Sequence, residues 1–374
     1  MIRVLELFAG IGACSKALER LGIEHEIVDA VEIDKFAIAS FNAIHGTNFE
    51  PQDIKKWNKD IKVDLIMHGS PCQDFSLAGK QAGGDKDSGT RSSLMYETLR
   101  IVEKLKPQIV IWENVKNILS QRHVHNWDAY AEYMEELGYT NYCQILNAKD
   151  YGIPQNRERV FTISILDYYD EEYHSFLAHN FNFPKPIKLE KKLKDFLEED
   201  VDESFNVSKK QLQGMINTNY QSYKLSKLLK DKNGMVDTIK ARFIGCPQLV
   251  IDESVKPSVA KNFEKEKEQI VKSDREMYQC KVTSGWSDNV VGLKIAPTLR
   301  AGNSCTYGMT SNCRIRKLTP KECWRLMGFD DEDFDKASKI CSNAQLYKQA
   351  GNSIVVNVME EIFKELLNCK ISIS

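Results

Sequence analysis

The chain has 374 residues, a formal net charge of −2 at pH 7, 42% hydrophobic residues and 28% charged residues. This length suits two domains, or one large domain with an insertion, and the composition is ordinary for a globular protein with a sizeable core. No stretch approaches the roughly 20 apolar residues of a membrane span. The first apolar run, at residues 2–8, has no basic segment or cleavage site before it. We therefore expect a cytoplasmic protein that does not bind membranes.

The ten cysteines show no C-x-x-C spacing, and no histidine pair has the spacing of zinc ligands. We therefore expect reduced thiols and no metal. The net charge hides an asymmetry: residues 206–320 hold 20 Lys and Arg against 10 Asp and Glu, a net of +10, whereas the rest of the chain has a net of −12. A basic segment beside an acidic remainder favours a polyanionic partner, but a well-solvated, Lys-rich surface explains it equally well.

Strand and helix signals alternate from the N-terminus to about residue 170. Helical spacing predicts helices at residues 13–21, 35–41, 94–105 and 126–137. Apolar runs predict strands at residues 4–8, 26–33, 63–67, 109–112, 142–146 and 160–166. This alternation is typical of an α/β fold, with a parallel sheet covered by helices on both faces.

The pattern changes in residues 184–320, which are polar, Lys-rich and weakly periodic. They predict a second, smaller domain of mostly irregular and β structure. A helix is expected at residues 320–328, with Thr319 as a candidate N-cap and Pro320 at the first position. A last helix is expected at residues 354–367.

The first strand ends in a glycine turn that reads Phe8-Ala-Gly10-Ile-Gly12. Glycines let the backbone turn tightly and approach a ligand, with a helix N-terminus just beyond. Glu32 follows at the end of the next strand, where an acid can accept both hydroxyls of a ribose. Each feature also has a plain structural explanation, but together they favour a nucleoside-containing cofactor, either a dinucleotide or S-adenosylmethionine.

Two further strand ends and one extended segment carry reactive side chains. Cys72 follows the third strand beside a stiffening proline and is placed like a nucleophile, although a buried cysteine is the commoner case. Glu113 follows the next strand and could protonate a ring nitrogen. Arg157 and Arg159 would share one face of an extended segment and suit phosphate or carbonyl-oxygen contacts, or else form a surface cluster with Glu158.

The series LFAGIG, GSPCQDFS, RSSLMYE, WENV, YGIPQNRERVF, RKLTPKECWRLMGF and YKQAGNSIVVNV resembles the DNA (cytosine-5) methyltransferases of bacteria and phages. The motifs stand in the family's order at both ends of the chain. The resemblance implies a Rossmann-like, S-adenosylmethionine-dependent methyltransferase sheet with a target-recognition domain. It implies a catalytic and cofactor-binding domain at residues 1–183 and 340–374, and a target-recognition domain with hinge at residues 184–339.

The resemblance also assigns roles to individual residues. Cys72 resembles the nucleophile, Glu113 the group that protonates the cytosine ring, and Arg159 the contact to the base carbonyl. Arg157 resembles the residue that braces the glutamate and a phosphate. Residues that resemble S-adenosylmethionine contacts are Phe8, Gly10, Gly12, Glu32, Asp53, Ile54, Pro71, Leu94, Asn352 and Ser353. Some positions depart from the family pattern. Ser70 replaces the usual phenylalanine, and Gln52 the usual glycine before Asp53. The others are Ala13, Met327 and Asp330, where glycine, glutamine and proline are usual.

The expected partner is double-stranded DNA, from which the target base must be flipped to reach the active site. Gln73 and Ser76 resemble residues of the closing catalytic loop, and Arg242, Gln248 and Arg300 are candidate base readers by residue type. We expect a monomer, because one chain holds every motif. A cognate restriction endonuclease that acts separately is a further candidate partner.

Three alternatives remain at this point. A tRNA cytosine-5 methyltransferase shares the same motifs, but the large basic segment argues against it. A nicotinamide-dependent oxidoreductase would explain the glycine turn and Glu32, and would leave Cys72, Glu113 and Arg159 unexplained. A DNA-binding relative without activity is disfavoured because these three residues are intact.

Overall fold

The computed structural model describes residues 1–71, 84, 88–170, 175–177, 180–206, 229–230, 235–239, 249–252 and 314–369. The chain divides into two compact units. The first comprises residues 1–191, 237–243 and 320–374, and the second comprises residues 192–236 and 244–319. The expected recognition range of 184–339 thus includes residues 184–191, 237–243 and 320–339, which belong to the first unit.

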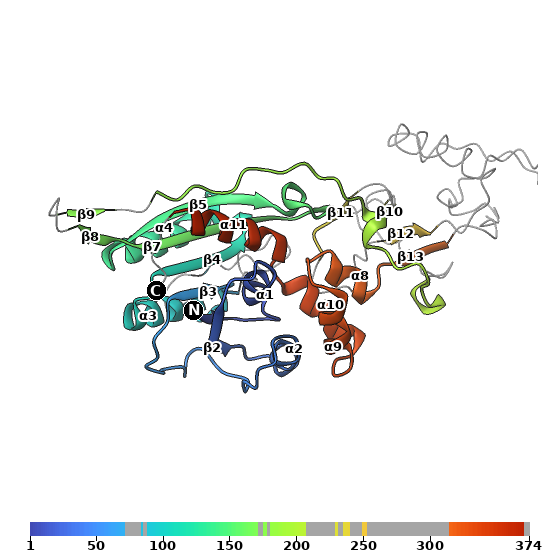
Figure 1. The fold of residues 1–374 in the computed structure, drawn as a ribbon, viewed down its shortest axis with the longest axis horizontal. Helices are drawn as coiled ribbons and strands as arrows, with labels where there is room; N and C mark the ends of the chain where they lie inside the picture. Colours follow the sequence, from blue (N-terminus) through green and yellow to red (C-terminus); the bar gives the residue numbers. More distant parts are fainter. Residues whose placement is uncertain are drawn as a thin grey trace, which may run out of the picture. The chain divides into compact units, whose positions relative to one another are not determined.

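A six-stranded sheet forms the centre of the first unit, in the order β2-β1-β3-β4-β7-β5 (Figure 1). Its strands are β1 (Ile2–Leu7), β2 (His25–Val31), β3 (Leu65–His68), β4 (Ile109–Val115), β5 (Tyr139–Asn147) and β7 (Glu158–Leu166). Buried aliphatic side chains of these strands form the core, as the apolar runs predict.

The prediction of an entirely parallel sheet is wrong for one strand. β7 runs antiparallel to both of its neighbours, β4 and β5. Only residues 148–157 join β5 to β7, and a parallel crossover needs a dozen or more residues. The reversed strand therefore follows from the length of the connection.

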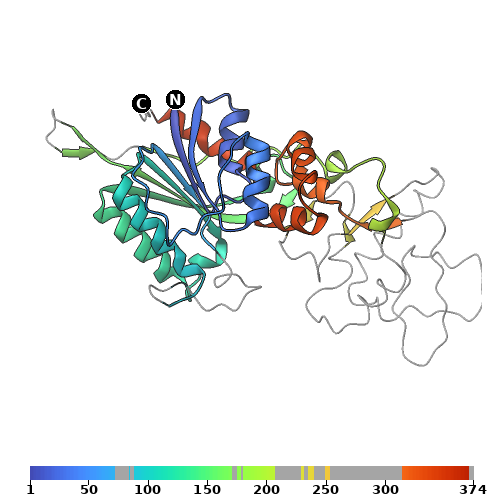
Figure 2. The same cartoon turned by 90° about the horizontal axis from the view of Figure 1, so that it is seen from below.

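Helices cover both faces of the sheet, as expected, with α3 and α4 on one face and α1 and α11 on the other (Figure 2). The helices are α1 (Ala13–Arg20), α2 (Lys35–His45), α3 (Met95–Leu105), α4 (Val124–Glu136), α8 (Pro320–Arg325), α9 (Asp331–Ser338), α10 (Asn343–Asn352) and α11 (Val356–Asn368). Short 3-10 turns are η1 (Ser92–Leu94), η2 (Lys116–Leu119), η3 (Ala148–Tyr151), η4 (Leu193–Phe196) and η5 (Glu203–Phe205).

The C-terminal helices pack back onto the N-terminal ones. α11 packs against α1, and α9 packs against α2. Lys16 of α1 is buried and forms ion pairs with Asp333 at 3.0 Å and Asp330 at 3.1 Å. The motifs from the two ends of the sequence are thereby held in one unit.

The second unit contains a small sheet of β10 (Leu229–Lys230), β12 (Leu249–Asp252) and β13 (Arg314–Lys317). β12 is antiparallel to β13 and parallel to β10. Four further short strands belong to the first unit or its boundary: β6 (Gln155–Asn156) pairs with β11 (Val236–Asp237), and β8 (Tyr168–Asp170) pairs with β9 (Ser175–Leu177). Within the described ranges, no helix is long and apolar enough to cross a membrane.

Candidate active site

The glycine turn after β1 brings four of the predicted cofactor residues together. Phe8, Gly10 and Gly12 have φ angles of 53°, 58° and 82°, so the chain passes through the left-handed region three times before α1 begins. A phenylalanine in this region is uncommon and marks a strained backbone. The Gly10 amide donates to Oε2 of Glu32 at 3.1 Å, which places the carboxylate at the end of β2 beside the turn.

Glu32 is held in place by backbone amides. Its Oε1 accepts from the Asp34 amide at 2.8 Å. Burial raises the pKa of the Glu32 carboxyl, and the amide donors oppose that shift. Ile33 beside it is 71% exposed, an unusual state for isoleucine at the end of a buried strand. Exposure at a strand end has no signal in the residue pattern, so Ile33 could not be singled out from the sequence.

Asp53 and Ile54 lie on the segment between α2 and β3. Asp53 caps a turn by accepting from the Lys55 amide at 3.0 Å, and Ile54 is buried. The unusual Gln52 donates through Nε2 to the buried carboxylate of Asp29 at 2.8 Å. Because this bond ties the segment to β2, the departure from glycine serves a structural purpose.

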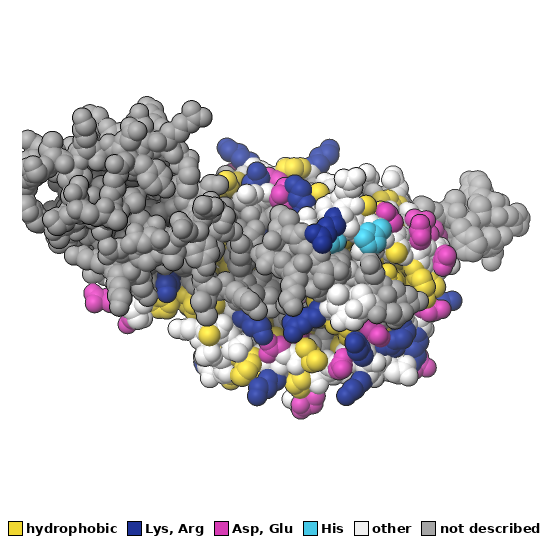
Figure 3. All heavy atoms as spheres, turned by 180° about the vertical axis from the view of Figure 1, so that it is seen from behind, with side chains coloured by type: hydrophobic (Ala, Val, Ile, Leu, Met, Phe, Trp, Pro, Cys, Tyr) yellow, Lys and Arg dark blue, Asp and Glu magenta, His cyan; other side chains and the backbone are white. Residues whose placement is uncertain are grey.

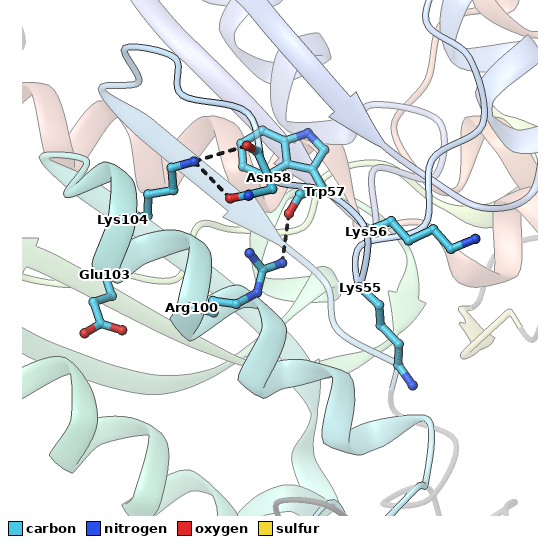
Figure 4. Close-up of a pocket in the computed structure, with 7 residues that line it drawn as sticks. All are labelled: Lys55, Lys56, Trp57, Asn58, Arg100, Glu103 and Lys104. Atoms are coloured by element: carbon cyan, nitrogen blue, oxygen red, sulfur yellow. Dashed lines mark hydrogen bonds between the residues drawn. The ribbon is translucent and has the colours of Figure 1, made fainter.

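α3 fixes the same segment from the other side (Figure 4). Arg100 donates to the carbonyl oxygens of Ile54 at 3.1 Å and Trp57 at 2.9 Å, and Lys104 donates to that of Asn58 at 3.1 Å. These side chains line a cavity of about 620 Å³ bounded by Lys55, Lys56, Trp57, Asn58, Arg100, Glu103 and Lys104. The cavity therefore stands next to the predicted cofactor residues and contains none of them.

The remaining predicted cofactor residues come from three places. The Pro71 carbonyl accepts from Oγ of Ser92 at 2.9 Å, which links it to the turn that starts α3. Leu94, in that turn, is partly buried against the core. Asn352 is exposed at the end of α10, whereas Ser353 is buried.

Glu113 and Arg159 form an ion pair, with Nε of Arg159 at 2.9 Å from Oε1 of Glu113. The sheet register explains the pair: Arg159 lies opposite Val115, which shares a face of β4 with Glu113. Glu113 is 9% exposed. Burial raises the pKa of its carboxyl, and the charges of Arg159 and Arg157 oppose this. A buried acid with a raised pKa is suited to proton transfer.

Arg157 is buried, and its guanidinium is directed at backbone oxygens. Nη1 donates to the Ile239 carbonyl at 3.0 Å, and Nη2 donates to those of Ser353 at 2.6 Å and Gly351 at 3.3 Å. Gln155 is also buried and accepts from the Ile239 amide through Oε1 at 3.1 Å. Both polar groups of the Ile239 backbone are therefore held by side chains of the QNRER motif.

Several predicted residues lie outside the described part of the chain, namely Cys72, Gln73, Ser76, Arg242, Gln248 and Arg300. Most of the basic segment lies there as well. On the described surface seen in Figure 3, basic and acidic side chains are interspersed. Among the described residues, no group of His, Cys, Asp and Glu could hold a metal ion.

Comparison with known proteins identifies relatives along the whole chain. The model of the C-5 cytosine-specific DNA methylase family matches residues 2–368. The type II methyltransferase M2.ScrFI of Lactococcus lactis subsp. cremoris is 34% identical over 98% of this chain and 99% of its own. The type II methyltransferase M.HhaI of Haemophilus parahaemolyticus is 31% identical over 96% of this chain and 93% of its own.

Solved structures share the fold. A DNMT2 variant from Spodoptera frugiperda superposes with a TM-score of 0.67 at 21% identity, covering 98% of this chain and all of its own. The Dnmt2 methyltransferase of S. pombe gives a TM-score of 0.62 at 18% identity, covering 98% and 99%. The predicted methyltransferase sheet is thereby confirmed. The family match and the relatives together show that the chain belongs to the C-5 cytosine-specific DNA methylases, which methylate carbon 5 of cytosine in DNA with S-adenosylmethionine.

Proposed function

We propose that this enzyme methylates a cytosine flipped out of duplex DNA within a specific short sequence, through a covalent bond between Cys72 and carbon 6 of the base. The observation that carries this proposal is the buried ion pair of Glu113 and Arg159. Oε2 of Glu113 lies 3.7 Å from the position that a Cβ on Gly69 would occupy. Cys72 follows Gly69 by three positions in the chain, so the acid stands beside the segment that leads to the nucleophile.

The side chains suit each step of this path. Attack by the Cys72 thiolate on carbon 6 makes carbon 5 nucleophilic, and Glu113 donates a proton to the ring nitrogen as the adduct forms. Arg159 contacts the base carbonyl oxygen. After carbon 5 gains its methyl group, a base removes the proton from that carbon. The thiolate leaves carbon 6, and Glu113 recovers its proton.

The residues around the glycine turn fit S-adenosylmethionine. A Cβ at Gly10 would meet only the Phe8 carbonyl, at 4.0 Å, so space for a ligand lies over the turn. Glu32 would accept the ribose hydroxyls, and the exposed Ile33 would cover an apolar part of the adenosine. Asp53, Ile54, Pro71, Leu94, Asn352 and Ser353 would complete the pocket. When bound, S-adenosylmethionine supplies the methyl group.

The second compact unit and the basic excess of residues 206–320 support a role in reading the target DNA. Because the target carbon lies inside the stacked duplex, the base must be flipped out before Cys72 can reach it. We propose that the enzyme acts as a monomer and that any restriction endonuclease with the same target is a separate protein.

Bisulfite sequencing tests this function directly. The intact protein and its Cys72→Ala variant are expressed in a host that lacks 5-methylcytosine. We expect cytosines in one short sequence to be protected only by the intact protein. If the Cys72→Ala variant also protects them, the covalent mechanism is wrong. If nothing is protected although the protein binds S-adenosylmethionine, RNA becomes the substrate to test.

A further inference from the structure

The chain is fixed at three points just before it reaches Cys72. Oγ of Ser70 accepts from Nε1 of Trp112 at 2.9 Å. Nδ2 of Asn114 lies 3.4 Å from both the Ser70 carbonyl oxygen and its Oγ. The Pro71 carbonyl accepts from Oγ of Ser92 at 2.9 Å. Ser70, Trp112 and Asn114 are each at most 3% exposed, so these bonds form away from water and hold the backbone firmly.

The two side chains that bind Ser70 flank Glu113 in the sequence. Successive side chains on a strand point to opposite faces, so Trp112 and Asn114 share one face of β4 and Glu113 occupies the other. Ser70 is therefore tied to the residues on both sides of the proposed acid. Its position sets how the end of β3 lies against the end of β4.

Trp112 is itself fixed by its neighbours. The register of β3 and β4 pairs His68 with Trp112, and their rings stack at 5.7 Å with an interplanar angle of 6°. The ring of Tyr130 packs on the indole of Trp112, with 4.3 Å between the ring centroids. The indole has one polar atom, and that atom donates to Ser70. The tryptophan thus presents a rigid donor to the serine.

We propose that Ser70 is a positioning residue for the methylation reaction, because its hydroxyl sets the distance between the segment leading to Cys72 and Glu113. The phenylalanine that is usual at this position in the family has no side-chain oxygen to accept from Nε1 of Trp112 or Nδ2 of Asn114. This inference rests on the proposed roles of Cys72 and Glu113.

The test measures adduct formation separately from turnover. A duplex carrying 5-fluorocytosine in the target found by bisulfite sequencing traps the covalent adduct, since fluorine replaces the proton that must leave carbon 5. The rate of trapping at saturating DNA and S-adenosylmethionine is measured for the parent, Ser70→Ala, Ser70→Thr and Trp112→Phe. Steady-state kcat and KM are measured on ordinary target DNA.

We expect Ser70→Ala and Trp112→Phe to slow trapping about tenfold, because each leaves a buried partner without its hydrogen bond. The KM for S-adenosylmethionine should stay unchanged. Ser70→Thr keeps the hydroxyl and should stay within about twofold of the parent. The double variant Ser70→Ala/Trp112→Phe should be no slower than the slower single variant, because both remove the same bond.

Ser40→Ala is the matched control. Ser40 is fully buried and hydrogen-bonded to Gln349 at 3.2 Å, but it lies on α2 away from Glu113. It should lower thermal stability as Ser70→Ala does and leave the trapping rate unchanged. Parental trapping by Ser70→Ala, or equal losses in Ser70→Ala and Ser70→Thr, would overturn the positioning role. Absence of trapping by the parent protein would instead refute the covalent mechanism.

Discussion

Gly12 lies where the first turn meets α2, and replacing it with alanine tests how closely the two are packed. Its φ is +82°, and a Cβ would lie 2.1 Å from Nε2 of His45 and 2.9 Å from Cε2 of Phe41. Left-handed backbone costs an alanine about 1–2 kcal/mol. Overpacking a filled interior typically adds about 1–3 kcal/mol. We expect Gly12→Ala to lower the free energy of unfolding by about 2–5 kcal/mol.

Gly22→Ala is the matched control, because Gly22 has φ +66° and nothing lies within 4 Å of its Cβ position. It should cost only the conformational term, about 1–2 kcal/mol. Urea unfolding measures both variants. His45 also contacts the Ile11 carbonyl at 3.3 Å, so displacing it disturbs the turn. Calorimetry should therefore show S-adenosylmethionine binding weakened about tenfold in Gly12→Ala, a change of roughly 1.4 kcal/mol.

The reasoning is refuted if Gly12→Ala unfolds at the same urea concentration as Gly22→Ala and binds S-adenosylmethionine with the parental Kd. In that case, His45 and Phe41 would move aside without loss, and the turn would not depend on their packing.

Three further substitutions test charged groups that differ in burial. Lys16→Met removes the partner of Asp333, which is 2% exposed, and should lower the free energy of unfolding by about 3–5 kcal/mol. Lys348→Met, in a pair that is half exposed, should cost less than about 1 kcal/mol in the same urea titration, and equal losses would contradict this reasoning. Burial raises the pKa of the Glu6 carboxyl from the usual 4.5 to about 7. The folded protein therefore holds this proton more tightly than the unfolded chain, and the free energy of unfolding falls as the pH rises from about 4.5 to about 7. Glu6→Gln should therefore raise the melting temperature at pH 8 but not at pH 4.5, and equal shifts at both would contradict the assignment.

Local patterns were sufficient for most elements of the first unit, because buried strands and amphipathic helices have strong periodicities. The direction of β7 was the exception. Apolar content identifies a strand and says nothing of its direction. The ten-residue connection from residues 148 to 157 carried that information.

The site divides in the same way. The motifs predicted Glu113 and Arg159 as active-site residues but not their contact with each other. The register of β4 and β7 brings the two side chains into contact. The partner of Ser70 could not be predicted, because Trp112 is 42 positions away and a tryptophan in an apolar run reads as core. The hydrogen bonds from Arg157 to backbone carbonyl oxygens could not be predicted from the sequence either. They join segments that come together only in the folded chain.

Gln155 and Arg157 hold the Ile239 backbone within the first unit by hydrogen bonds, and this contact divides the chain of the second unit. The second unit is therefore made of two chain segments, residues 192–236 and 244–319, because residues 237–243 belong to the first unit. Closing a chain segment of twice the length costs only about 0.6 kcal/mol more. A change in the length of either segment should therefore cost the first unit little stability. The hydrogen bonds that hold Ile239 engage its backbone atoms, whereas its buried side chain adds apolar packing at the same point.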